Sequence, residues 1–331
     1  MENPIYLKSP QGALEAVVDL NGGMLAQLYW VKGERKIPVL HQAPWLKEGY
    51  YSQSAGLMEH LSGEWACVPF GFVTEDSSLF LKDAPHGLPC HSTWQVVALL
   101  EDKSKLVLGY DYPKNNDLER IERTIELTDK QVKLSYSIVS RTDCAVPMGA
   151  HPVFPTEGKD NELELEIIGD GMVYGIECEP QVSRLVPGKY FESLSKLPLQ
   201  EQYFNRDGNT EVMDGTHLPK PYATEEIVQM LHPQGQAILK YRNKGLKVTL
   251  SWDHKVIPTC LLWMSNYGRA FEPWDGKNCC LGIEPIAGAW DLAAQSICPD
   301  NAIASQGVPT TVKLKAGTKV TFAYSLFLED L

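Results

Sequence analysis

Three short segments of the chain hold side chains that could transfer protons. In the first, Glu284 stands in the aliphatic run CLGIEPI, residues 280–286. Burial among aliphatic neighbours raises the pKa of a carboxyl group toward the range of a general base, so Glu284 is the best base candidate. A carboxylate that pairs with an arginine or lysine for stability alone is the other interpretation of this position.

The second segment is GAHPVFP, residues 149–155, which places His151 between two small residues and a proline. Because proline fixes its own backbone angle, we expect the chain around His151 to be rigid and the imidazole to stay in one place. A histidine held in this way is suited to acid–base chemistry.

The third segment is PHGLPCHSTW, residues 85–94, where a turn-rich stretch leads into a strand that begins at Trp94. It contains His86 and His91. Their spacing matches neither a helical nor a zinc-ribbon metal site, and no third ligand follows at a recognisable distance. We therefore expect no metal site here.

Antiparallel hairpins are the elements expected to position these residues. Residues 120–140 alternate between apolar and polar side chains on both sides of a turn at 128–130, which is the pattern of two half-buried strands. The same pattern recurs at 93–112, 236–253 and 311–330. Hairpins therefore dominate the predicted architecture.

Helical periodicity is limited to short stretches at 189–194 and 224–231, and no glycine-rich phosphate loop is present. Folds built from alternating strands and helices are therefore disfavoured. The irregular parts, residues 41–92 and 198–222, are rich in proline, glycine and polar residues, so we expect them to form loops around a site. The sequence predicts an all-β fold, a large antiparallel β-sandwich with a single domain over residues 1–331.

The composition limits the partners and the location of the protein. A formal net charge of −12 without basic clusters disfavours nucleic acid and anionic membrane surfaces as partners. The N-terminus lacks the pattern of a secretory signal, and no apolar run approaches the ~18 residues of a membrane span. The eight cysteines show no C-x-x-C. We expect a cytoplasmic protein with reduced, mostly buried cysteines.

Taken together, the three segments resemble the motifs of a known family. A His-Gly turn before a Trp strand, then G-x-H-P-x-F, then G-I-E-P follow in this order. This series resembles the aldose 1-epimerase family and its galactose mutarotase-like relatives, which include hexose-6-phosphate epimerases, over about residues 10–330.

The resemblance implies a galactose mutarotase-like supersandwich with the site on its concave face. It also implies that Glu284 is the base, that His151 is the acid and that His86 binds and orients the sugar. Neither a cofactor nor a metal is implied, and the expected partner is a small-molecule sugar.

The chain departs from the relatives' pattern at positions that would bind a phosphate. The segment LSGEWACVPFG, residues 61–71, resembles R-G-G-x-P-x-C-x-P-x-x-G, but Leu61 or a neighbour stands where the relatives carry a sugar- or phosphate-binding arginine. The relatives' basic residue shortly after the His-Gly turn is also absent. Because leucine cannot replace a bidentate arginine, a non-phosphorylated sugar is favoured over a hexose 6-phosphate.

Two further parts of the site are less defined. The relatives' sugar-binding carboxylate between the last two motifs has three candidates here, Asp214, Glu225 and Glu226. Trp290, close to the Glu284 motif, offers an aromatic face of the kind that can stack on a sugar.

The predicted function is that of an aldose 1-epimerase (mutarotase) that acts on a free sugar through Glu284 and His151. The alternatives are a non-catalytic carbohydrate-binding protein on the same fold and a hexose-6-phosphate 1-epimerase. A glycoside hydrolase or lyase is a further alternative, but hydrolysis normally needs two carboxylates that flank the bond. The last alternative is a structural or interaction protein. The sequence does not indicate the sugar, its anomer or the oligomeric state.

Overall fold

The computed structural model describes residues 4–47, 56–73, 84–204 and 211–331. Strands dominate these residues. The helical elements are short: α1 (Pro44–Lys47), α2 (Ala293–Ile297) and the 3₁₀ turns η1 (Leu57–Glu59), η2 (Leu88–His91), η3 (Glu201–Tyr203) and η4 (Ala304–Gln306). Within the described ranges, no helix has the length and apolar character needed to cross a membrane.

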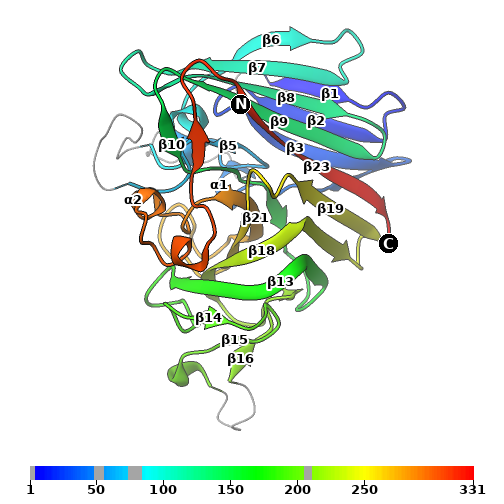
Figure 1. The fold of residues 1–331 in the computed structure, drawn as a ribbon. Helices are drawn as coiled ribbons and strands as arrows, with labels where there is room; N and C mark the ends of the chain where they lie inside the picture. The colour runs from blue at the N-terminus through cyan, green and yellow to red at the C-terminus, as the bar shows by residue number, and fades with distance from the viewer. Residues whose placement is uncertain (1–3, 48–55, 74–83, 205–210) are drawn as a thin grey trace.

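One long antiparallel sheet forms the body of the molecule (Figure 1). Its strands follow in the order β5 (Ala66–Cys67), β11 (Met148–Ala150), β21 (Cys279–Ala287), β20 (Thr259–Asn266), β18 (Thr224–Tyr241), β19 (Leu246–Trp252), β23 (Val320–Asp330), β9 (Gln131–Ser140), β8 (Leu118–Leu127), β7 (Lys105–Asp111) and β6 (Gln95–Leu99).

Further strands extend this sheet or pair beside it. Off the main path, β12 (Val153–Pro155) pairs with β21, and β13 (Leu163–Glu177) pairs with β18, β14 (Tyr190–Phe191) and β17 (His217–Leu218). Two small separate pairs join β10 (Cys144–Val146) to β22 (Val312–Leu314) and β15 (Leu197–Pro198) to β16 (Val212–Met213).

A second antiparallel sheet packs against the first and comprises β1 (Ile5–Lys8), β2 (Leu14–Asp19), β3 (Met24–Lys32) and β4 (Arg35–Pro38). It is drawn in blue beside β8, β9 and β23 in Figure 1. Leu14 and Leu28 of this sheet belong to the same buried cluster as Ile121 of β8 and Leu134 of β9. The fold is therefore a large antiparallel β-sandwich, as the sequence predicts.

The strands β20 and β21 and the first eight residues of β18 are buried on both faces. Leu262 and Ile283 point into the main core, whereas Leu261 and Ile286 belong to a second apolar cluster on the opposite face. Side chains alternate between the two faces of a strand, so Glu284 shares the face of Ile286. This second face holds the candidate site.

Three of the four expected hairpins are present. β8 pairs with β9, β6 with β7, and β18 with β19, each antiparallel. The hairpin expected at 311–330 is wrong, because β22 pairs with β10 while β23 pairs with β9 and β19. The turn between β22 and β23 passes the chain from one sheet to another.

The two helical expectations are also wrong. Residues 224–231 begin the long strand β18, and residues 189–194 contain the short strand β14. Both faces of the first segment are buried, so its apolar residues lack the alternation of a half-buried strand. The expectation for the cysteines agrees with the structure, since all eight are free and five of them are buried.

Candidate active site

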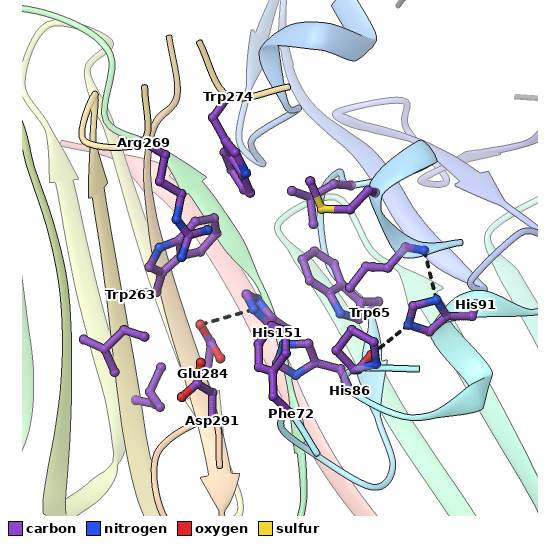
Figure 2. Close-up of a pocket in the computed structure, with 16 residues that line it drawn as sticks. Trp65, Phe72, His86, His91, His151, Trp263, Arg269, Trp274, Glu284 and Asp291 are labelled. Carbon is purple, nitrogen blue, oxygen red and sulfur yellow. Dashed lines mark hydrogen bonds and ion pairs between the residues drawn. The ribbon is translucent and has the colours of Figure 1, made fainter. Parts of the chain in front are cut away.

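A cavity of about 300 Å³ opens on the second face of the large sheet (Figure 2). Its walls are mostly aromatic and aliphatic, and its polar groups gather around Glu284 of β21. The segment 57–91 supplies half of the lining residues, as expected for the irregular part 41–92. The described residues of the other irregular part, 198–222, contribute none of them.

The structure brings the three residues singled out by the sequence motifs together. Nε2 of His151 lies 3.3 Å from Oε1 of Glu284. The rings of His86 and His151 meet edge to face, with centroids 5.3 Å apart. All three residues are buried and line the cavity, in which their side chains converge (Figure 2).

Strand pairing places His151 opposite Glu284. The short strands on either side of His151, β11 and β12, both pair with β21, so the residues between them are held against the strand that carries Glu284. Gly282 makes room for the carboxylate, because a Cβ at this position would stand 2.5 Å from Oε1 of Glu284. The backbone N–H of His151 donates to the carbonyl of Trp65.

Burial disfavours the charged forms of both Glu284 and His151. It raises the pKa of Glu284 well above its ordinary value, and the negative charge of Asp291 raises it further. It lowers the pKa of His151 well below that of a free histidine. The indole of Trp65 stacks on the imidazole at a centroid distance of 4.1 Å and covers one of its faces.

Three buried polar atoms of the candidate site residues lack a hydrogen bond with any described residue, although Oε1 of Glu284 faces Nε2 of His151. Within the described residues, Oε1 of Glu284 and Nδ1 of both His151 and His86 have no hydrogen bond. Burial also lowers the pKa of His86 to about 3, so this imidazole is neutral near neutral pH. Buried groups of this kind normally have partners, so hydroxyl groups of a ligand would satisfy them.

Several further residues line the cavity that the sequence did not single out as site residues. Trp65, Trp263 and Trp274 form aromatic walls, while Arg269 and Asp291 add charged groups. These residues come from separate loops and strands, and their meeting depends on the tertiary fold. Trp65 stands in the motif-like segment 61–71 and Asp291 lies close to the Glu284 motif, but the sequence holds no signal for the others.

The aromatic face expected from Trp290 is not part of the cavity lining. Its ring packs on Tyr174, with centroids 4.8 Å apart, in the apolar cluster beside the cavity. Trp65, Trp263 and Trp274 provide the aromatic walls instead.

None of the three carboxylates left open by the sequence lines the cavity. Asp214 accepts hydrogen bonds from Thr216 and lies 3.0 Å from His217. Glu226 accepts the backbone N–H of Arg184. Glu225 contacts the cavity lining, because it accepts a hydrogen bond from the indole N–H of Trp263, which is one of the lining residues. Asp291 is the carboxylate that lines the cavity together with Glu284.

His91 has a different environment from His86. Its Nδ1 accepts the backbone N–H of Leu57 at 3.1 Å, and its Nε2 donates to the carbonyl of Pro85 at 2.8 Å (Figure 2). Both ring nitrogens are therefore engaged by the backbone, which leaves neither free to bind a metal. His91 ties together two segments that line the cavity.

Comparisons with known proteins agree with this architecture. No family model matches the chain, and no curated protein matches it in sequence. Solved structures match it over almost its whole length. A candidate aldose 1-epimerase from Escherichia coli K12 is 18% identical, with a TM-score of 0.67 and coverage of 99% of both chains.

Two further structures give the same result. A galactose mutarotase-like protein from Lactobacillus casei is 14% identical, with a TM-score of 0.63 and coverage of 99% of this chain and 100% of that one. The GalM/aldose epimerase homologue from C. elegans is also 14% identical, with a TM-score of 0.63 and coverage of 99% of both chains. At these identities the likeness concerns the fold, and the chain has the galactose mutarotase-like fold that its motifs predict.

Proposed function

We propose that the protein is an aldose 1-epimerase (mutarotase) that interconverts the α and β anomers of a free sugar. The observation that carries this proposal is the buried pair of His151 and Glu284, whose facing atoms lie 3.3 Å apart in the cavity. The fold is shared with structures named as aldose epimerases or galactose mutarotase-like proteins.

The proposed reaction moves two protons in each direction. The carboxylate of Glu284 takes the proton of the anomeric hydroxyl, while the imidazolium of His151 gives its proton to the ring oxygen O5. The C1–O5 bond breaks as the C1 carbonyl forms. The open-chain aldehyde then rotates about C1–C2, and ring closure on the other face returns both protons. His86 is proposed to hold the sugar near its ring oxygen.

The charges in the cavity favour a neutral sugar over a hexose 6-phosphate. Arg269 is the cationic side chain nearest to the aromatic walls, but its Nε donates to Glu179 at 3.0 Å and lies 3.4 Å from Glu225. Leu61 lines the cavity where a relative's arginine is expected. A phosphate would therefore meet an arginine whose charge is already balanced.

The test is the rate at which fresh solutions of α-D-glucose and α-D-galactose reach rotational equilibrium. We expect the wild-type protein to accelerate at least one of them, and Glu284→Gln to lose nearly all of the acceleration. Glu226→Gln is the matched control, because Glu226 is equally buried but faces the backbone of Arg184, outside the cavity. The control should keep full activity.

Binding of sugar without acceleration by the wild-type protein would favour the alternative of a non-catalytic carbohydrate-binding protein. Substantial activity in Glu284→Gln would show that the base is another group.

A further inference from the structure

A second set of buried polar side chains lies behind Trp65, outside the cavity. We name it the Glu64 cluster: Glu64, on the segment that leads into β5, with Arg123 of β8, Tyr136 of β9 and Tyr324 of β23. Glu64, Arg123 and Tyr136 are 0% exposed, and Tyr324 is 3% exposed.

The carboxylate of Glu64 is the centre of this cluster. Arg123 donates to its Oε2, and the hydroxyls of Tyr136 and Tyr324 donate to its Oε1. The two hydroxyls also lie 2.7 Å apart. Arg123 donates in addition to the carbonyl of Gly23, in the turn between β2 and β3 of the second sheet. Three neighbouring strands therefore converge on one carboxylate.

The strands interrupt their apolar pattern to make this cluster. On β8, Arg123 stands between Ile121 and Ile125, both fully buried, at a position where another aliphatic residue would continue the core. Replacing a buried ion pair by apolar groups of similar size is often neutral or stabilising. Stability alone therefore does not account for the cluster.

The cluster is linked to the candidate acid through Trp65, the residue that follows Glu64. The carbonyl of Trp65 accepts the backbone N–H of His151 at 3.0 Å, and its indole stacks on the imidazole with an interplanar angle of 22°. The next two residues form β5, which pairs with β11 directly before His151. The position of Glu64 therefore determines the position of Trp65, against which His151 packs.

We propose that Glu64 is a positioning residue: its buried bonds to Arg123 and the two tyrosines fix Trp65, and Trp65 holds the imidazole of His151 against Glu284. The consequence for turnover rests on the proposed mutarotase activity. The cluster touches neither a substrate nor the reacting atoms, so its effect passes through the alignment of the acid–base pair.

The decisive variant replaces the whole cluster by apolar residues of similar size, with Glu64→Leu, Arg123→Met, Tyr136→Phe and Tyr324→Phe together. We expect an unchanged or higher Tm, because an apolar core replaces a buried ion pair. We expect kcat for mutarotation to fall at least ~10-fold with KM within about twofold, since small misplacements of catalytic groups are costly.

A single substitution tests the same proposal in case the variant with all four replacements does not fold. Tyr324→Phe removes one hydroxyl, and the backbone of Glu64 keeps its pairing with Leu25. Tyr241→Phe is the matched control, because within the described residues that buried hydroxyl has no hydrogen-bond partner. We expect kcat to fall about threefold or more in Tyr324→Phe and to stay unchanged in the control.

A readout without turnover separates this proposal from the proposed function. The imidazole nitrogen NMR signals of His151 should shift in Tyr324→Phe and stay in place in Tyr241→Phe. If the wild-type protein accelerates no sugar, the proposed function fails while this comparison still tests the positioning. Unchanged His151 signals in Tyr324→Phe, or unchanged kcat in a folded fourfold variant, would overturn the positioning role.

Discussion

Glu284 and His151 are poised to exchange one proton. Burial raises the pKa of the first and lowers that of the second, and so favours a protonated carboxyl group beside a neutral imidazole. The reactive pair proposed above, a carboxylate with an imidazolium, differs from it only in the position of that proton. The pair can therefore supply base and acid together wherever it holds a single proton.

Asp291 should set the alkaline limit of this range. Its negative charge raises the pKa of Glu284, on which the last proton of the pair resides. In Asp291→Asn that charge is gone, so the pKa of Glu284 falls and the pair loses its proton at a lower pH. We expect the alkaline limb of the profile of kcat/KM against pH, which reports on the free enzyme, to move to lower pH.

Asp214→Asn is the control for this pH profile, since Asp214 is a partly exposed carboxylate outside the cavity. It should leave both limbs in place. An alkaline limb that is identical in Asp291→Asn and the wild type would show that Asp291 does not act on the pair.

At the level of residues, the sequence identified those that sit in short distinctive motifs. Glu284, His151 and His86 each stand in a local pattern of small, proline or aliphatic neighbours, and the structure brings them together. Trp263 and Asp291 have no such pattern. They reach the cavity only through the pairing of β20 with β21 and the loop after β21, which no local spacing encodes.

At the level of elements, a strand can be recognised from the sequence when only one of its faces is buried. Half-buried strands such as β8 and β9 alternate strictly and were predicted as a hairpin. β18 starts with eight consecutive buried residues, so its periodicity could not distinguish a strand from a helix. The pattern at 311–330 does not reveal that β22 and β23 belong to different sheets, because a hairpin turn and a turn between two sheets have similar sequences.

The loops over the cavity depend on His91. Its ring joins the backbone of η1, at Leu57, to the carbonyl of Pro85, just before η2. In His91→Ala both hydrogen bonds are lost, each of which contributes about 1 kcal/mol. We expect KM for the sugar to rise about threefold to tenfold with a smaller change in kcat, and Tm to fall by a few degrees.

The control for this variant is His254→Ala, because His254 is exposed on the turn after β19. Steady-state kinetics give KM and kcat of both variants, and thermal melts give their Tm. A KM in His91→Ala equal to that of the control would mean that the two loops keep their places without the imidazole.

On the scale of the whole molecule, buried acids and buried histidines give stability opposite dependences on pH. Burial raises the pKa of Glu225 and that of Glu226 to about 7, so the folded state binds more protons than the unfolded state above pH 4.5. Their contribution is complete below that pH and is lost as pH rises through about 7. Burial lowers the pKa of His41 to about 4 and that of His86 to about 3, so their contribution instead grows as pH rises to 6.5.

Between about pH 4.5 and 6.5, a rise in pH lowers the stability contributed by the two glutamates and raises that contributed by the two histidines. Above about pH 6.5, only the contribution of the glutamates still changes. We therefore expect the free energy of unfolding to decline from mildly acidic pH toward pH 8. Glu226→Gln removes one of the titrating acids and keeps an oxygen that can accept the N–H of Arg184. Between pH 5.5 and pH 8 this variant should lose about 2 kcal/mol less than the wild type.

Urea unfolding at the two pH values measures this difference, and the change between them, rather than either absolute value, carries the prediction. Glu164→Gln is a suitable comparison, because Glu164 lies near the surface and its pKa is lowered by Lys240 and Arg242. Its carboxylate is already ionised in both states at pH 5.5, so that variant should follow the wild type. Equal losses in Glu226→Gln and the wild type would mean that Glu226 is ionised throughout this range and is stabilised by the backbone N–H groups that it accepts.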